Sequence, residues 1–265
     1  MNTITAETGV PAYSAHYPSL HGKRVFITGG GSGIGACLVE AFARQGARVA
    51  FVDIAERESA QLVEDLRAKG LAAPWWRVCD VTDVPALQAA IRDSAAELGD
   101  FNVLVNNVAS DDRHAIAAVT PEYWDQRMAI NQRPAFFAIQ AVLPGMRKAR
   151  NGSIVNVGSM GWQAKTGAYP AYATAKSSVM GLTRGLAKEL GAERIRINVV
   201  SPGWVMTERQ LRMNAVPDMA GELARIQCVP DPIQAHHIAA MVVFLASDDA
   251  AACTAQEFVV DAGWT

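Results

Sequence analysis

The stretch Thr28-Gly-Gly-Gly-Ser-Gly-Ile-Gly-Ala36 decides the fold of this chain. It lies between a short β-rich run, KRVFIT at residues 23–28, and apolar residues at helical spacing over residues 34–45. Gly46 follows where a glycine commonly ends a helix. Glycines allow a sharp turn between a strand and a helix, and the free N–H groups that begin a helix bind phosphate. The stretch therefore predicts either a plain tight turn or the first strand–turn–helix unit of a dinucleotide-binding domain.

Outward from this turn, strands and helices alternate along the chain. Further strands are predicted at residues 48–53, 75–79, 101–106, 153–157, 195–200 and 258–261, and helices at residues 56–69, 84–98, 172–190 and 233–246. Thr120 and Pro121 begin another helix, which carries Asn131 and which Pro134 should kink or break. Residues 201–229 read as an irregular functional loop with short helices. The order predicts a single-domain, Rossmann-type α/β fold: a doubly wound parallel sheet of about seven strands with helices on both faces.

Composition narrows the class of protein. The chain has 265 residues, from which we expect an N-terminal extension at residues 1–20 and one domain at residues 21–265. A net charge of −2 argues against nucleic acid as a partner. No apolar run reaches the length of a membrane span, and residues 1–20 lack the pattern of a signal peptide. Four cysteines without a CxxC pair suggest buried free thiols, and hence a cytoplasmic protein.

Two acidic residues follow predicted strands beside the glycine turn. A carboxylate at Asp53 can accept both ribose hydroxyls of an adenosine and would repel a 2′-phosphate. Because no Arg or Lys stands near it before Arg57, the sequence favours NAD over NADP. Asp80 is placed to meet an adenine. Alternatively, each acid would cap the helix that follows it.

Tyr172 and Lys176 stand four residues apart, on one face of a predicted helix. A lysine near a tyrosine stabilises the phenolate and lowers the phenol's pKa from about 10. Such a tyrosine can act as general base towards an alcohol. Ser159 follows the fifth predicted strand, where it is either a turn residue or a hydroxyl facing the same site.

Residues 22–265 resemble the short-chain dehydrogenase/reductase family in the order and spacing of several motifs. The matching pieces are Thr28-Gly-xxx-Gly33-x-Gly35, Asp80-Val81, Asn106-Asn107, Asn131, Ser159, Tyr172-xxx-Lys176 and Pro202-Gly203 with Thr207. One departure is Val108-Ala109 where the family usually has Ala-Gly, and this change would reshape the nicotinamide pocket without removing a catalytic group.

The resemblance implies a role for each matching residue. Tyr172 would take the substrate's hydroxyl proton, Ser159 would hold its oxygen, Lys176 would lower the pKa of Tyr172, and Asn131 would hold a water that links Lys176 to solvent. The residues that would bind NAD are Gly29, Gly31, Ser32, Gly33, Ile34, Gly35, Asp53, Ile54, Asp80, Val81, Asn107, Val108, Tyr172, Lys176, Pro202, Gly203, Val205 and Thr207.

Within the family, several local strings resemble bacterial aldose dehydrogenases of the D-xylose 1-dehydrogenase type. They are Tyr17-Pro-Ser-Leu, Asp111-Asp112-Arg113-His114 and the ending Asp261-Ala-Gly-Trp264. The resemblance implies oxidation of an aldose to an aldonolactone. Loops at the carboxyl ends of strands would supply the substrate contacts Asp111, Asp112, Ser159, Trp162, Gln163, Tyr172 and Trp204. Alternatively, Asp112 is ion-paired with Arg113 at a solvated helix start. No compact metal-ligand set stands out.

Two other functions stay open at this stage. One is an NAD(P)-dependent dehydrogenase or reductase of another alcohol or ketone, such as a 3-oxoacyl thioester or a cyclic ketone, with the same four catalytic residues. The other is a dinucleotide-binding regulator without turnover. By analogy with the family we expect a homotetramer built on the helices at residues 131–146 and 172–190 and on the C-terminal strand.

Overall fold

The computed structural model describes residues 15–165, 167–214 and 216–265. Within them, seven parallel strands form one sheet in the order β3-β2-β1-β4-β5-β6-β7. The strands are β1 (Arg24–Thr28), β2 (Arg48–Asp53), β3 (Trp75–Val78), β4 (Val103–Asn106), β5 (Gly152–Val157), β6 (Ile195–Pro202) and β7 (Glu257–Val260). This confirms the predicted α/β architecture. The strand order reverses between β1 and β4, which is where open sheets of this kind bind ligands.

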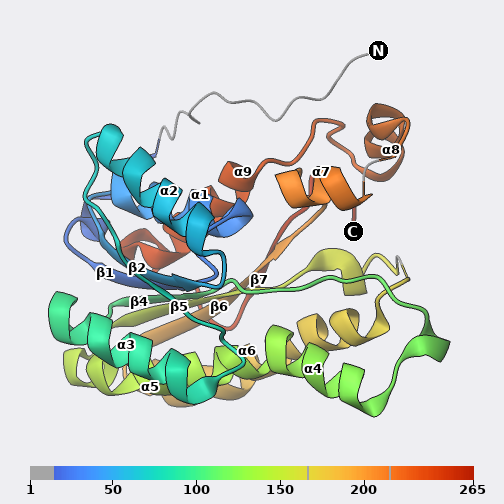
Figure 1. Ribbon diagram of the computed structural model, residues 1–265. Coiled ribbons are helices and arrows are strands. Elements are labelled where there is room, and N and C mark those ends of the chain that lie inside the picture. The colour runs from blue at the N-terminus through green and yellow to red at the C-terminus, as the bar shows by residue number, and fades with distance from the viewer. Residues whose placement is uncertain (1–14, 166, 215) are drawn as a thin grey trace.

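Helices cover both faces of the sheet, as predicted (Figure 1). On one face lie α1 (Gly33–Arg44), α2 (Glu56–Ala68) and α9 (Ala235–Ala246). On the other lie α3 (Val84–Leu98), α5 (Arg133–Ala149) and α6 (Pro170–Ala192), with α4 (Pro121–Asn131) against α5 and α6. The layers leave the carboxyl ends of the strands open to the loops that follow them.

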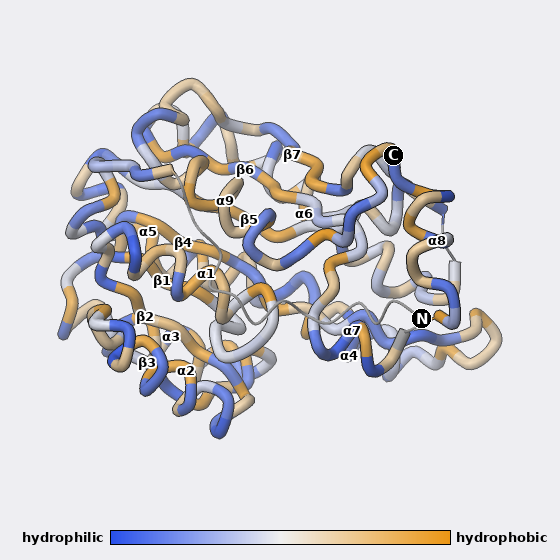
Figure 2. Tube along the Cα trace, turned by 90° about the horizontal axis from the view of Figure 1, so that it is seen from above, coloured by the Kyte–Doolittle hydropathy of each residue, from blue (hydrophilic) through white to orange (hydrophobic). Residues whose placement is uncertain are grey.

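The inner strands of the sheet contribute side chains to two hydrophobic cores, one on each face. Along β1, Val25 and Ile27 pack into the core shared with α1 and α9, whereas Phe26 packs into the core shared with α3 and α5. All three side chains are fully buried. Figure 2 shows hydrophobic residues running through the middle of the molecule and hydrophilic residues at its outer turns. A strand buried on both faces has no polar side to present, which explains its continuous apolar sequence.

Pro134 breaks the helix pattern where the sequence places the break. Helix α4 ends at Asn131, Gln132 leaves the helical region with φ −128° and ψ −56°, and Pro134 stands in the first turn of α5. A proline is tolerated there because the first N–H groups of a helix have no partner within it. The expected cap is also present, since Oγ1 of Thr120 accepts a hydrogen bond of 3.2 Å from the N–H of Tyr123.

The segment predicted as an irregular functional loop contains two short helices, α7 (Glu208–Asn214) and α8 (Met219–Ile226). They follow β6 at the carboxyl edge of the sheet, where Figure 1 shows both helices together. This segment therefore lies beside the site expected at that edge.

Part of the predicted extension packs on the domain. The side chain of Gln45, at the end of α1, accepts a hydrogen bond from the N–H of Tyr17 and donates one to the carbonyl of Ala15, and Leu20 is fully buried. Residues 1–14 lie outside the described residues. No helix in the described ranges is long and apolar enough to cross a membrane.

The four cysteines all lie in the described part of the chain and form no disulfide there. Cys79 is buried, but Cys37 and Cys253 are half-buried and Cys228 is exposed. The expectation of buried thiols is therefore wrong for Cys228, because that residue follows α8 on the surface, outside both cores.

Candidate active site

A cavity of about 1510 Å³ opens at the carboxyl edge of the sheet. This exceeds the roughly 300–1,000 Å³ typical of small-ligand sites, and leaves room for a dinucleotide together with a small substrate. Twenty of the predicted site residues line it: Gly29, Ser32, Gly33, Ile34, Gly35, Asp53, Ile54, Asp80, Val81, Asn107, Val108, Asp111, Ser159, Tyr172, Lys176, Pro202, Gly203, Trp204, Val205 and Thr207. Gly31, Asp112, Asn131, Trp162 and Gln163 are not in the lining.

The glycine turn forms one end of this cavity. Gly29 has a φ of +69°, and a Cβ on Gly35 would stand 1.7 Å from the carbonyl oxygen of Gly29, so the turn closes only without side chains there. The N-cap of α1, Ser32, makes no side-chain hydrogen bond to the helix. The first N–H groups of α1 therefore remain available to a phosphate at the cavity.

The two acids beside the turn do not cap the helices after them. Oδ2 of Asp53 accepts a hydrogen bond of 2.8 Å from the N–H of Gly31, and Oδ1 accepts one of 2.9 Å from the N–H of Ala55. Asp80 is exposed on the cavity wall, and Asp83, not Asp80, caps α3. The alternative capping roles are therefore wrong, and both carboxylates stay at the cavity.

These residues fit an adenine dinucleotide. Ile54 lines the cavity with 71% of its surface exposed, although it is a large apolar residue beside Asp53. Such a side chain offers a flat apolar contact to a base, while the neighbouring carboxylate suits ribose hydroxyls and the open start of α1 suits a pyrophosphate. Ile54 directly follows Asp53, and Asp53 is hydrogen-bonded to Gly31 just before α1, so the three features adjoin one another.

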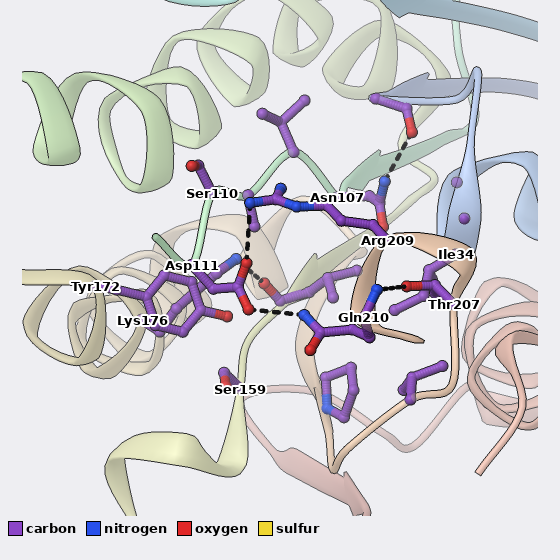
Figure 3. Close-up of a pocket in the computed structure, with 18 of the residues that line it drawn as sticks. Ile34, Asn107, Ser110, Asp111, Ser159, Tyr172, Lys176, Thr207, Arg209 and Gln210 are labelled. Carbon is purple, nitrogen blue, oxygen red and sulfur yellow. Dashed lines mark hydrogen bonds and ion pairs between the residues drawn. The ribbon is translucent and has the colours of Figure 1, made fainter. Parts of the chain in front are cut away.

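Tyr172 and Ser159 meet at the other end of the cavity (Figure 3). Tyr172 lies in the first turn of α6, Ser159 follows β5, and both side chains line the same end of the cavity. Burial raises the pKa of Tyr172, and the carboxylate of Asp111 raises it further, whereas Ser159 acts in the opposite direction. The net shift is upward, opposite to the lowering expected from the Tyr-xxx-Lys spacing.

Lys176 lies one turn beyond Tyr172, and only 3% of its surface is exposed. Its Nζ donates a hydrogen bond of 2.7 Å to the carbonyl oxygen of Val157. Burial lowers the pKa of Lys176 to about 8, because an ammonium group loses its hydration there. The lysine is thus bound to β5 and holds its proton only weakly.

Asn131 anchors the loop after β4. Its Oδ1 accepts a hydrogen bond of 2.8 Å from the N–H of Ser110, and its Nδ2 donates to the carbonyls of Ser110 and Arg127. Arg127 is also buried and forms an ion pair of 2.7 Å with Asp112. Asp112 therefore pairs with Arg127 and not with Arg113, whose guanidinium stacks on the ring of Tyr169 at 4.1 Å. No helix begins at residues 111–114.

The carboxylate of Asp111 lies beside the ring of Tyr172 and faces α7 (Figure 3). Its Oδ2 accepts a hydrogen bond of 2.7 Å from Nε2 of Gln210, and its Oδ1 lies 3.3 Å from Nη2 of Arg209. That guanidinium also pairs with Asp112 at 3.0 Å. An acid, an amide and a phenol thus surround the space next to Ser159, which suits a ligand rich in hydroxyl groups.

Sequence reasoning missed several wall residues and included five that are not in the lining, among them Trp162 and Gln163. Arg209, Gln210, Tyr169 and Trp264 line the cavity, and of these only Trp264 belongs to a string that carried the sugar-enzyme resemblance. Outside the lining, Trp162 is 38% exposed and Gln163 donates to Glu257. The described residues contain no cluster of three or more His, Cys, Asp or Glu that could hold a metal ion.

Comparisons with known proteins agree with this geometry. A family model described as enoyl-(acyl carrier protein) reductase matches residues 29–265. D-xylose 1-dehydrogenase of Caulobacter vibrioides is 47% identical over 251 residues, which are 95% of this chain and 99% of that protein. A probable galactose dehydrogenase of Rhizobium meliloti is 46% identical over 94% of this chain and 98% of its own.

Among solved structures, a 3-oxoacyl-[acyl-carrier protein] reductase with bound NAD from Brucella melitensis has a TM-score of 0.83 and 30% identity to this chain. The match covers 93% of this chain and 92% of that one.

Proposed function

The chain belongs to the short-chain dehydrogenase/reductase family, and from that premise we propose that it oxidises the anomeric hydroxyl of an aldose with NAD, giving an aldonolactone. It is an enzyme, an oxidoreductase that acts on CH–OH groups, so the regulator without turnover is set aside. The domain that performs this reaction spans residues 21–265 in the proposal.

In the proposed reaction, Tyr172 takes the proton of the anomeric hydroxyl on its Oη. Ser159, which lines the cavity at the same end as that phenol, holds the same substrate oxygen. When bound, the dinucleotide supplies the hydride acceptor, C4 of its nicotinamide ring. Lys176, whose pKa burial lowers to about 8, provides the nearby cation that favours the phenolate. The pKa of Tyr172 is raised in the protein without bound ligands, so formation of the phenolate during the reaction requires a cation close to the phenol.

The preference for NAD rests on Asp53. Its carboxylate is held at the cavity wall by the N–H groups of Gly31 and Ala55. A 2′-phosphate placed there would meet this negative charge at close range, whereas two ribose hydroxyls could donate to it. The remaining cofactor contacts in the proposal are the lining residues of the glycine turn and Ile54, Asp80, Val81, Asn107, Val108, Tyr172, Lys176, Pro202, Gly203, Val205 and Thr207.

One observation carries the choice of an aldose: the carboxylate of Asp111 and the amide of Gln210 stand together beside the Tyr172 ring. Both groups form hydrogen bonds with hydroxyls, and a site built on such groups rejects ligands that lack them. The 47% identity to a D-xylose 1-dehydrogenase supports the same choice.

A second candidate is the reduction of a 3-oxoacyl thioester or another ketone by the same residues. The likeness to solved 3-oxoacyl reductases at about 30% identity favours it. Its acyl chain would have to lie against the polar wall formed by Asp111 and Gln210, which an apolar chain cannot satisfy.

The test measures NADH formation at 340 nm with a panel of pentoses, hexoses, 6-deoxyhexoses and simple secondary alcohols. We expect turnover with one group of aldoses and release of the corresponding lactone. Consumption of NADH or NADPH with 3-oxoacyl thioesters, together with no reaction on any sugar, would establish the second candidate instead.

We further propose a homotetramer built on α5, α6 and β7. Phe136 on α5 is 44% exposed, which is apolar surface that a partner subunit would cover. Light scattering of the purified protein should give four times the mass of the chain, and a monomer would overturn this assembly.

A further inference from the structure

His114 ties the loop after β4 to the helix that carries Tyr172 and Lys176. Its Nε2 accepts a hydrogen bond of 3.2 Å from the N–H of Ala171, the second residue of α6. The two residues are 57 positions apart in the sequence. Neither His114 nor Ala171 lines the cavity, so this contact lies behind the catalytic residues and not in front of them.

Helix α6 depends on this contact because its own sequence supplies no cap. The N-cap residue, Tyr169, makes no side-chain hydrogen bond to the helix, and Pro170 at the first position has no N–H. The N–H of Ala171 is therefore the first donor of the helix, and it is buried. A buried donor without a partner is unfavourable, and here the imidazole provides the acceptor that Ser, Thr, Asp or Asn usually provides.

The Nδ1 side of the imidazole ring also makes two polar contacts. An Nε2 that accepts from an N–H carries no hydrogen of its own, which assigns the ring N–H to Nδ1. Nδ1 stands 2.9 Å from the carbonyl oxygen of Asp112 and 2.9 Å from Oη of Tyr123 on α4. The rings of His114 and Tyr123 also meet edge to face, with centroids 4.9 Å apart. These contacts fix both the tautomer and the orientation of the ring.

Neighbouring contacts join the same two segments. The N–H of His114 donates a hydrogen bond of 2.7 Å to the carbonyl of Ala168, just before α6. Arg113 stacks on the ring of Tyr169, which in turn packs edge to face on Tyr172 with centroids 5.3 Å apart. The first turn of α6 is thus held from outside by the loop that also carries Asp111.

We propose that His114 is a positioning residue: by capping α6 at Ala171 it sets the place of the Tyr172 phenol against Ser159 and the substrate. The inference rests on the proposed role of Tyr172 as general base. Tyr172 is the residue directly after Ala171, so fraying of the first turn moves the phenol. A shift of about 1 Å in a reacting group can lower a rate by about a hundredfold.

Two matched variants separate the cap from other effects. In His114→Gln, the amide oxygen reaches the position of Nε2 and can still accept from Ala171. In His114→Asn, the amide reaches only the position of Nδ1, so it can donate to Asp112 but leaves the N–H of Ala171 without a partner. Both replacements are polar and uncharged, and Asn is one methylene shorter than Gln.

The first readout is amide hydrogen exchange at Ala171 and at Ala173, whose N–H donates to the carbonyl of Tyr169, and this readout does not depend on the reaction. We expect wild type and His114→Gln to protect both amides, and His114→Asn to exchange them at least tenfold faster. The second readout is turnover per NAD-binding site, so that misfolded protein is not counted. We expect kcat to fall about tenfold to a hundredfold in His114→Asn and less than threefold in His114→Gln, with KM for NAD unchanged in both.

Equal exchange rates or equal kcat in the two variants would overturn the proposal, as would rapid exchange of Ala171 in the wild-type protein. A parallel Tyr172→Phe variant distinguishes this failure from that of the proposed function. If Tyr172→Phe keeps its turnover, the general-base role is wrong. The cap itself is then still judged by the exchange rates.

Discussion

Nζ of Lys176 donates a hydrogen bond of 2.7 Å to the carbonyl oxygen of Val157, the last residue of β5. The interaction joins the long helix α6 to the end of β5, at the wall of the cavity that holds Tyr172. Since the lysine is almost completely buried, its ammonium group has lost its water and gained one neutral acceptor in return. That exchange explains why the pKa of Lys176 falls to about 8.

The first prediction concerns stability and pH in the protein without ligands. Below pH 8 the lysine is protonated in both the folded and the unfolded chain, and above its ordinary pKa of 10.5 it is neutral in both. Between these values the unfolded chain binds one more proton, so the free energy of unfolding rises with pH by about 1.4 kcal/mol per unit. From pH 8 to pH 9.5 we expect a gain of about 2 kcal/mol from Lys176, measured by urea unfolding.

The control is Lys176→Met, which has a side chain of similar length and no titrating group. The free energy of unfolding of the wild type minus that of the variant should increase by about 2 kcal/mol from pH 8 to pH 9.5. Staying below pH 9.5 avoids Tyr172, whose raised pKa has the opposite effect once the unfolded phenol begins to ionise. A difference that stays constant with pH would mean that Lys176 is not desolvated.

Much of the fold could be predicted because its signals are local. The strand at residues 23–28, the glycine turn after it and the break at Pro134 each follow from the conformational limits of a few adjacent residues. Alternation of such units leaves few arrangements other than a parallel sheet covered on both faces. The seven strands and the presence of helices on both faces therefore agree with the sequence.

The parts of the site that escaped prediction depend on contacts between distant segments. Gln210 reaches Asp111 across the cavity, and His114 caps a helix 57 residues away. No spacing rule connects these pairs. The pKa of Tyr172 shows the same limit: the spacing to Lys176 suggested a lowered value, but burial, which depends on the whole fold, raises it.

A second prediction tests the general base. Tyr172→Phe removes the group that takes the proton of the substrate hydroxyl in the proposed reaction, so kcat should fall about a thousandfold. Binding of NAD, followed by fluorescence titration, should change less than threefold. Tyr169→Phe is the matched control, since Tyr169 packs on Tyr172 and also lines the cavity, and it should keep most of the turnover.

A third prediction concerns cofactor choice. Asp53→Asn removes the charge that would repel a 2′-phosphate but keeps an oxygen that can accept from the N–H of Gly31 or Ala55. Asp53→Ala removes both. We expect the ratio of kcat/KM for NADP to that for NAD to rise at least tenfold in each variant, with loss of thermal stability only in Asp53→Ala. An unchanged ratio in both variants would show that Asp53 only holds the glycine turn in place and does not select the cofactor.

The last prediction separates the two possible roles of the polar wall. If Asp111 and Gln210 bind the hydroxyls of an aldose, Asp111→Asn and Gln210→Leu should each raise KM for the sugar about tenfold, which corresponds to about 1.4 kcal/mol, and leave KM for NAD unchanged. Arg209→Gln is the control, because Arg209 pairs with the same carboxylate but is 40% exposed, and such ion pairs contribute about 0–1 kcal/mol. Its KM for the sugar should therefore stay within about fivefold of wild type. If all three variants behave alike, the acid and the amide only hold α7 in place, and the hydroxyl groups of the substrate must be recognised by other residues of the cavity.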